Sequence, residues 1–454
     1  MLSHSRSRLP LIILLLMALA AGALAWQVAT RSLVAFLAVA APDWAMALAP
    51  GNSDVLLNLA EEKLGLRVHG KYVATDEAAP PPTAKANAAA AALRAKGIVV
   101  PLLPPEISAS ARDQVRQWVA AALRSDPFDA RALRILGQAA DTEAQAASYM
   151  QKSFAHSQHE FLAGYWLLQK SYLEGDFAKT IFYADVLLRS KPQFESFIVP
   201  VLGRIAETNG GIGPIKTLLK SNPPWRRRFF YTLVSSISDA RTPLTLMLDM
   251  QANGMPPTPE EVQFYLTFLM NKKFYELAYY SWAQFLSADD LTGMGLLFNG
   301  NFTSALSEVP FDWNITRGKG SRIDIVDRAD KPGQKALYFE FAGIMIDAFE
   351  VKQVVTLVPG KYRLRGLQMG DIRARRGMRW QVACYDNPFS PFAESADFVG
   401  AVANWREFSF DFTVPAKNCQ AQQLWLALDA RLDSERIVAG SASFAELALT
   451  PKPN

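Results

Sequence analysis

Aromatic and polar residues at strand spacing in the last third of the chain could together recognise a sugar. A sugar ring stacks its C–H groups on a flat aromatic face, and its hydroxyl groups need nearby side chains that donate and accept hydrogen bonds. The residues that fit this pattern, on predicted strand faces opposite the core, are Tyr338, Glu340, Arg379, Gln381, Tyr385, Trp425 and Asp429. These seven are our candidates for glycan binding. The alternative is that this face packs against a helix.

Other aromatic and acidic residues nearby fit structural roles better. We expect Trp313, Trp380 and Trp405 in the core or at strand corners, because large aromatic side chains are mostly buried. Asp324, Asp327 and Asp330 could suggest the paired acids of a glycosidase. They lie in a turn-like stretch rich in Arg, Lys, Pro and Gly, so we expect them in a solvated loop.

No group of residues matches a catalytic or metal site. The four histidines are dispersed, and only His156 and His159 could share a helix face. That pair lacks the glutamate and the third ligand of a zinc hydrolase. We therefore expect no catalytic residue, no metal and no cofactor, and a binding protein rather than an enzyme.

The two cysteines, Cys384 and Cys419, could form one disulfide in an oxidising compartment. Such a bond would close a loop of roughly 35 residues and stabilise the fold by about 3–4 kcal/mol in the chain-entropy model. The alternative is two buried thiols. Because the N-terminus predicts export, we favour the disulfide.

The composition describes a folded protein with a mild positive charge. Its 454 residues suggest two or three domains, and 50% hydrophobic with 20% charged residues is typical of globular chains. The net charge of +4 is scattered along the chain. Nucleic-acid binding would need a basic stripe with interleaved aromatic residues, so we expect no nucleic-acid partner.

The N-terminus predicts a membrane segment. Residues 9–29 carry no charge, and 21 residues at 1.5 Å each span a hydrocarbon core of about 30 Å. Arg6 and Arg8 precede them, which predicts a cytoplasmic N-terminus and export of the rest. We assign 1–31 to a cytoplasmic n-region and transmembrane signal-anchor. Ala23-Leu24-Ala25 resembles a cleavage site, so a cleaved signal peptide is the alternative.

The middle of the chain has helical periodicity. Residues 32–108 predict an Ala/Pro-rich helical and linker region, and residues 109–290 predict a helical repeat domain. Residues 162–192 form the clearest unit: a helix, the turn Gly175-Asp176-Phe177, a second helix and the closing Pro192. This is the pattern of a tetratricopeptide repeat. Such repeats stack into a solenoid whose groove could hold a protein partner.

After Leu297 the apolar period changes to two. Leu337, Phe339 and Phe341 occupy every second position, so they share one face of a strand. Phe408, Phe410 and Phe412 show the same alternation. About eight short strands with turn signals predict an antiparallel β-sandwich or jelly roll over residues 296–452. The fold class is therefore multidomain α plus β: a transmembrane helix, a TPR-like α-helical solenoid and a C-terminal sandwich.

Short motifs in the sandwich resemble a known family. Asn299-Gly300-Asn301-Phe302 followed by Trp313 resembles the opening of galactose-binding-like carbohydrate-binding modules, and Phe444-Ala445-Glu446-Leu447 resembles their closing strand. The resemblance implies a jelly roll that binds glycan. Those modules often hold calcium with an opening Glu and a closing Asp. Thr303 and Ala445 occupy these positions here, so we predict no calcium.

The whole arrangement resembles periplasmic tetratricopeptide proteins of bacterial exopolysaccharide gene clusters. In these, a Trp-x-x-x-Cys strand pairs with a later Pro-x-x-x-Cys, matching Trp380 to Cys384 and Pro415 to Cys419. The resemblance implies a single-pass bacterial inner-membrane protein with its bulk in the periplasm. It would be a scaffold in exopolysaccharide biosynthesis or export, with a protein partner in the helical groove and polysaccharide on the sandwich. The alternatives are a polysaccharide hydrolase or lyase, or a purely structural envelope assembly protein.

Overall fold

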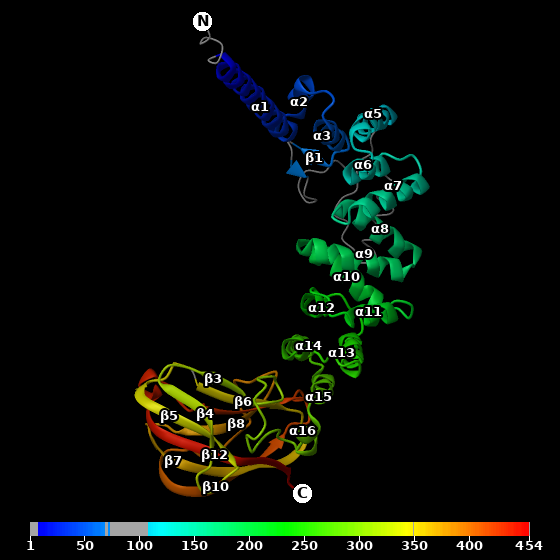
Figure 1. The fold of residues 1–454 in the computed structure, drawn as a ribbon. Coiled ribbons are helices and arrows are strands. Elements are labelled where there is room, and N and C mark those ends of the chain that lie inside the picture. The colour runs from blue at the N-terminus through cyan, green and yellow to red at the C-terminus, as the bar shows by residue number, and fades with distance from the viewer. Residues whose placement is uncertain (1–7, 69–70, 73–107, 348, 454) are drawn as a thin grey trace. The chain divides into compact units, whose positions relative to one another are not determined.

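The computed structural model describes residues 8–68, 71–72, 108–347 and 349–453. The chain divides into two compact units, Met1–Thr242 and Pro243–Asn454 (Figure 1). The sequence placed the boundary between residues 290 and 296, where the periodicity changes. In the structure the helices from Pro243 onward group with the sandwich instead, because aromatic side chains of one of them pack on it, as described below.

The first unit is helical apart from a small hairpin. Its elements are α1 (Arg8–Ala40), α2 (Pro42–Leu48), α3 (Ser53–Lys63), β1 (Arg67–Val68), β2 (Lys71–Tyr72), α5 (Ala109–Ser125), α6 (Ala130–Gln138), α7 (Glu143–His156), α8 (Phe161–Glu174), α9 (Phe177–Ser190), η1 (Pro192–Phe194), α10 (Glu195–Ala206), α11 (Ile212–Leu219) and α12 (Arg226–Leu233). The predicted linker region thus contains α2 and α3, and α3 packs against α5. The Ala-rich and Pro-rich stretches between residues 80 and 105 lie outside the described residues.

Helix α1 confirms the prediction of an apolar N-terminal helix. Its part Ile13–Ala40 is long and apolar enough to cross a membrane, and the most apolar stretch of it is exposed throughout. The helix continues through Arg31 to Ala40, well past the uncharged segment that the sequence marks.

The predicted helix–turn–helix over residues 162–192 is present as α8 and α9, which pack against each other. Gly175 adopts the left-handed conformation that ends α8, with φ of 77°, and the Asp176 side chain accepts the Lys179 backbone N–H at 3.0 Å to cap α9. At Gly164 of α8, a Cβ atom would lie 2.7 Å from the Phe154 ring. A small residue there therefore lets α7 and α8 approach closely.

A buried ionic cluster ties α3 to the helices that follow. Glu61 of α3 is fully buried and pairs with Arg131, at 2.6 Å, and with the equally buried Arg134. Arg134 also reaches Glu160, at 2.9 Å, at the start of α8. Burial acts to raise the pKa of Glu61, but the two arginines outweigh it and lower that pKa. Breaking such a pair would leave a buried charge without compensation.

The second unit contains four helices and a β-sandwich. Its helices are α13 (Thr242–Ala252), α14 (Pro259–Asn271), α15 (Tyr275–Ala283) and α16 (Ala288–Thr292), with η2 (Asp433–Arg436) among the strands. One sheet, here the short sheet, has the order β3 (Asn314–Arg317), β6 (Phe349–Val355), β11 (Gln422–Leu428), β8 (Met378–Cys384) and β9 (Ala393–Glu394). The other, the long sheet, has the order β10 (Gly400–Val414), β7 (Gly360–Arg373), β12 (Ile437–Pro451), β5 (Lys335–Met345) and β4 (Ser321–Asp327). All the pairings are antiparallel, as predicted.

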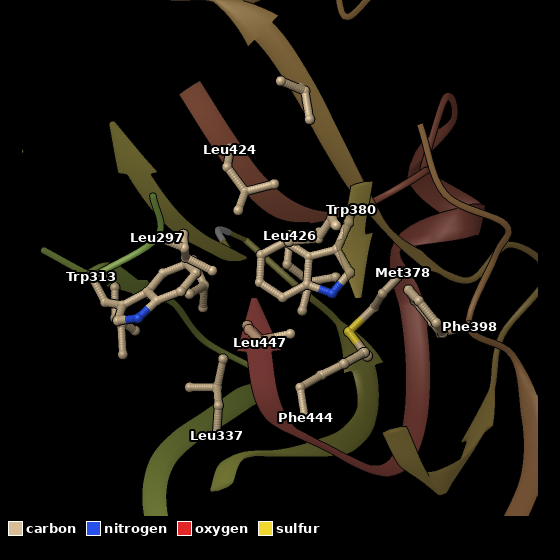
Figure 2. Packing of buried hydrophobic residues seen from close by; sticks show 14 of the residues in the cluster. Leu297, Trp313, Leu337, Met378, Trp380, Phe398, Leu424, Leu426, Phe444 and Leu447 are labelled. Atoms are coloured by element: carbon tan, nitrogen blue, oxygen red, sulfur yellow. The ribbon is translucent and has the colours of Figure 1, made fainter. Parts of the chain in front are cut away.

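The core lies between the two sheets (Figure 2). Trp313 and Trp380 are fully buried, which confirms their prediction as core residues. The Trp380 ring on the short sheet meets Phe444 of the long sheet edge to face at 5.8 Å. Aromatic pairs of this geometry add to the burial of apolar area in holding two layers together.

The opening motif of the sandwich is structural. Asn299, in the left-handed region with φ of 50°, bonds through its side-chain amide to both backbone groups of Ser304. The Trp313 indole N–H donates to the Asn299 carbonyl at 3.0 Å. Gly300 lies so close to β12 that a Cβ would be 2.0 Å from the Leu447 carbonyl oxygen. This motif therefore fastens the entering chain to the last strand.

The predicted disulfide is confirmed: Cys384, at the end of β8, is bonded to Cys419, with a Cα–Cα distance of 4.9 Å. It joins the end of β8 to the loop that leads into β11, its neighbour in the short sheet. The staple therefore reinforces one layer of the sandwich.

Candidate functional site

The seven predicted glycan-binding residues all lie outside the inner core cluster, but on two opposite outer faces. Tyr338 and Glu340 lie on β5 of the long sheet. The other five lie on strands β8 and β11 of the short sheet or directly after them: Arg379, Gln381, Tyr385, Trp425 and Asp429. Because the core separates the two sheets, the structure does not bring the seven together.

Helix α15 covers one end of the short-sheet outer face. The Tyr275 ring meets Tyr385 edge to face at 5.6 Å, and the Tyr275 hydroxyl donates to the Asp386 carboxylate at 2.5 Å. Lys273 adds an ion pair to Asp386 at 3.1 Å. Burial acts to raise the Asp386 pKa, but these two partners outweigh it and lower that pKa. The Tyr385 ring therefore packs against helix α15.

Further along α15, two aromatic side chains pack on the entry loop of the sandwich. Trp282 meets Phe298 at 4.9 Å and Phe311 at 5.6 Å, and Tyr279 meets Phe311 at 5.4 Å. This contact explains why the helix belongs to the sandwich unit. On the same sheet, Trp425 is only 8% exposed, so its indole offers little surface to a ligand.

The polar residues of the short-sheet outer face bond to one another. Arg379 pairs with Glu394 at 2.5 Å, Asp397 at 2.6 Å and Asp429 at 3.0 Å. Gln381 donates to Glu394 at 3.0 Å. Burial acts to lower the Arg379 pKa, but the bonds from Asp397 and Glu394 outweigh it and raise that pKa. The hydrogen-bonding capacity of this face is therefore largely used within the protein.

The outer face of the long sheet is open. One row of directly paired residues crosses three of its strands, from Asp324 on β4 to Tyr338 on β5 and Ser443 on β12, and then reaches Met369 on β7. The next row contains Arg322, Glu340, Ser441 and Asp371, of which all but Ser441 are exposed. We call these two rows the open face. Tyr338 is its half-exposed aromatic residue.

Trp405 supplies a second aromatic ring at the far side of the open face. It lies in the irregular stretch of β10 between Val402 and Arg406, next to the β7 residues 368–370. Its indole N–H donates to Asp330 at 2.9 Å, and the Arg328 guanidinium stacks over its ring at 4.5 Å from the centroid. The core half of its prediction as a core or corner residue was wrong, because Trp405 is only half-buried and lies outside the core cluster. The alternation of the inward Phe408, Phe410 and Phe412 could have revealed its outward direction.

The ring of Trp405 is held by a buried arginine. The Arg328 side chain is 1% exposed and pairs with Asp330 and with Glu446 of β12, each at 2.6 Å. Lys331 also pairs with Glu446, at 3.0 Å. The hydrogen bond from Lys331 lowers the pKa of Glu446, and Arg328 adds to the effect. Glu446 is the one acid in the closing motif, and its charge is therefore balanced by Arg328 and Lys331.

The structure corrects the prediction that Asp324, Asp327 and Asp330 lie in a solvated loop. Asp324 and Asp327 lie on strand β4 rather than in a loop, because the strand extends to residue 327. Asp330 does lie in the turn after β4, but it is bonded to Arg328 and Trp405. Its pKa is lowered, chiefly by the Arg328 hydrogen bond. It is thus a positioning residue for the indole.

A shallow hollow lies beside β10 and includes Met369 of the open face in its lining. The charged residues that line the hollow are Asp397 and Arg406. Within the described ranges, no three His, Cys, Asp or Glu side chains gather as metal ligands would. The chemistry that the open face provides is therefore ring stacking, hydrogen bonding and local charge.

No protein-family model matches the chain, and no curated protein matches it. Among solved structures, the chain is similar to a CBM4 structure, with 17% identity and a TM-score of 0.27, over 34% of this chain and 99% of that one. It is also similar to TmCBM61 in complex with β-1,4-galactotriose, with 15% identity and a TM-score of 0.26, over 35% and 99% of the two chains. A protein from Bacteroides thetaiotaomicron described as sugar binding has 12% identity and a TM-score of 0.26, over 35% and 100%. Because these identities and TM-scores are low, the candidate site is defined by the contacts within this chain.

Proposed function

We propose that this is a membrane-anchored binding protein whose sandwich binds a glycan on the open face of the long sheet. The observation that carries the proposal is the pair of half-buried aromatic residues on that face, Tyr338 on β5 and Trp405 on β10, which keep part of their surface exposed. Three strand spacings separate β5 from β10, a distance of about 14 Å. Two aromatic residues on separate strands of one face suit a short stretch of polysaccharide.

The floor between the two rings suits a sugar chain. Ser443 and Met369 lie between Tyr338 and β10 in the first row, and the second row adds polar groups at Glu340 and Ser441. Arg328 and Asp330 hold the Trp405 indole in one orientation before any ligand arrives. Fixing a binding group in advance reduces the entropy lost on binding.

The remaining parts of the proposal concern the other unit. Helix α1 would be the single-pass anchor in a bacterial inner membrane, with the bulk of the protein in the periplasm. The helices from α5 to α12 would form a TPR-like solenoid whose groove binds a protein partner. The role in exopolysaccharide biosynthesis or export, as a scaffold rather than an enzyme, is supported by the resemblance of the motifs alone.

A purely structural envelope protein is the second candidate. The observation that favours it is the contact of α15 with Tyr385, which uses one sandwich face for packing. That contact leaves the open face of the long sheet uncovered by α15. The two candidates therefore differ in whether the open face binds a sugar.

The test is polysaccharide pulldown and glycan-array binding with the full chain in detergent. We expect Trp405→Ala and Tyr338→Ala each to weaken binding at least about tenfold, the effect of losing about 1.4 kcal/mol of stacking. Tyr280→Ala is the matched control, because Tyr280 is 58% exposed on α15 and away from the open face. Absence of binding to any glycan by the wild type would favour the structural candidate.

A further inference from the structure

Helices α1 and α2 of the helical unit carry a stripe of exposed apolar side chains where the two helices meet. Five large residues at the end of α1 and on α2 have between 48% and 73% of their surface exposed. They are Leu33, Phe36, Val39, Trp44 and Leu48, which we call the base stripe. Exposed apolar surface of this size usually marks an interaction site.

The base stripe belongs to a folded surface. The opposite sides of the same helices pack together, where Ala38 of α1 and Ala45 of α2 form a cluster with Val55 and Leu59 of α3. The Asn58 side chain of α3 also donates to the Ala38 carbonyl. The stripe is therefore the unpartnered outer side of a small helical assembly, with its inner side already occupied.

The length of α1 indicates what covers the stripe. The apolar part Ile13–Ala40 has 28 residues and rises about 42 Å, whereas a hydrocarbon core needs only about 30 Å. Thr30, Arg31 and Ser32 form a polar break just before the stripe begins. The surplus of the helix, about 12 Å, therefore lies beyond the hydrocarbon core, at the depth of the lipid headgroups.

We propose that the base stripe docks onto the headgroup boundary of the bilayer that α1 crosses. This inference rests on the proposed role of α1 as a membrane anchor. The stripe resumes the apolar surface of α1 directly after the polar break, so the same bilayer can contact both. Tryptophan is enriched at this boundary, and Trp44 is the most exposed residue of the stripe. Helices with one apolar face also bind at this boundary, where they lie parallel to the membrane surface.

The test uses the full chain in phospholipid nanodiscs with one fluorescent label. Both native cysteines are in the disulfide, so a single introduced cysteine is the only free thiol. An environment-sensitive dye is placed at Trp44→Cys, with Leu48→Cys as a second position in case the first variant misfolds. Leu24→Cys reports on the middle of α1, and Phe182→Cys, at an exposed position of α9, is the control outside the membrane. Lipids with a spin label near the headgroup or deep in the acyl chain quench the dye.

We expect the dyes at 44 and 48 to lose most of their emission with the headgroup spin label, and the dye at 24 with the deep one. The dye at 182 should keep its emission with both. Deep quenching at 24 without quenching at 44 and 48 would overturn the docking and leave the anchor intact. A blue shift at 44 without lipid quenching would also overturn it, because a second copy or another protein then covers the stripe. Absence of quenching at 24 as well would remove the anchor and the docking together.

Discussion

The two outer faces of the sandwich are built from the same residue types and used differently. On the short sheet, Tyr385 is packed by helix α15, Trp425 is 8% exposed, and Arg379 is surrounded by three carboxylates. On the long sheet, Tyr338 and Trp405 are half-exposed beside a polar row. An aromatic residue flanked by polar groups is thus a better binding candidate where its ring keeps some exposed surface, as Tyr338 and Trp405 do.

The two faces also differ in the role of an arginine side chain. Arg379 joins three acids and closes a network at the surface of the short sheet. Arg328 is also held by acids but turns its flat face to the Trp405 ring. The first arrangement uses polar groups within the protein, and the second fixes the orientation of an aromatic ring. Four predictions can break or sharpen this comparison.

The largest effect should come from Trp425→Ala. Because this side chain is buried on the covered face, we expect its removal to destabilise the sandwich by about 3–5 kcal/mol. Trp405→Ala on the open face should cost only about 1–2 kcal/mol, from the lost cation–π contact and hydrogen bond. Denaturant unfolding monitored by near-UV circular dichroism compares the two. Equal losses would remove the distinction between the faces.

The next effect should come from the disulfide of the short sheet. Replacing Cys384 and Cys419 together by serine should cost about 3–4 kcal/mol, because the loop between them is released in the unfolded chain. Denaturation midpoints of the variant and of the wild type, with and without reductant, measure the loss. A wild type that reductant does not destabilise would contradict the expectation. Glycan binding by the folded variant should be unchanged, since the open face lies on the other sheet.

Arg379→Gln should have a smaller effect on stability. The side chain is 18% exposed, so removing its charge leaves three carboxylates partly hydrated and costs about 1–2 kcal/mol. Binding of polysaccharide should stay at the wild-type level. The opposite pattern, weaker binding with unchanged stability, would move the site to the short-sheet face, where five of the seven predicted residues lie. Titration of the variant and of the wild type with the same polysaccharide distinguishes the two.

The smallest effect should be the pH dependence of the contact between α15 and the sandwich. The pKa of Asp386 is lowered in the folded protein, so its stabilisation is present above the unfolded pKa near 3.8 and is lost as the pH falls through the folded value. Tyr275→Phe should cost less than about 1 kcal/mol at neutral pH, because Asp386 is more than a third exposed. The difference from the wild type should shrink below about pH 4. Urea midpoints at pH 7 and pH 3 measure both.

The sequence predicts elements well where the pattern is local. Alternation at Leu337, Phe339 and Phe341 correctly predicts a half-buried strand, and the turn at Gly175 correctly predicts a helix pair. It cannot predict which sheet a strand joins, because strand pairing depends on contacts far apart in the chain. Tyr338 and Trp425 both have outward patterns, yet they lie on opposite sides of the molecule.

The candidate site was harder to predict for the same reason. Trp405 is marked by its outward phase, but its partners Arg328 and Asp330 come from a turn about 75 residues earlier. The domain boundary also depended on distant contacts, because α15 has ordinary helical spacing and only its aromatic contacts assign it to the sandwich. These features are set by tertiary contacts rather than by local periodicity.

The ionic cluster around Glu61 has a consequence for the order in which the chain acquires its structure. The arginines that neutralise Glu61 follow it by 70 and 73 residues. Until they emerge, burying this carboxylate costs several kcal/mol, so the Glu61 side of α3 stays hydrated during synthesis. The packing of α3 is therefore completed only after α6 has left the ribosome. Throughout that interval, the apolar side of α3 remains accessible to chaperones and proteases.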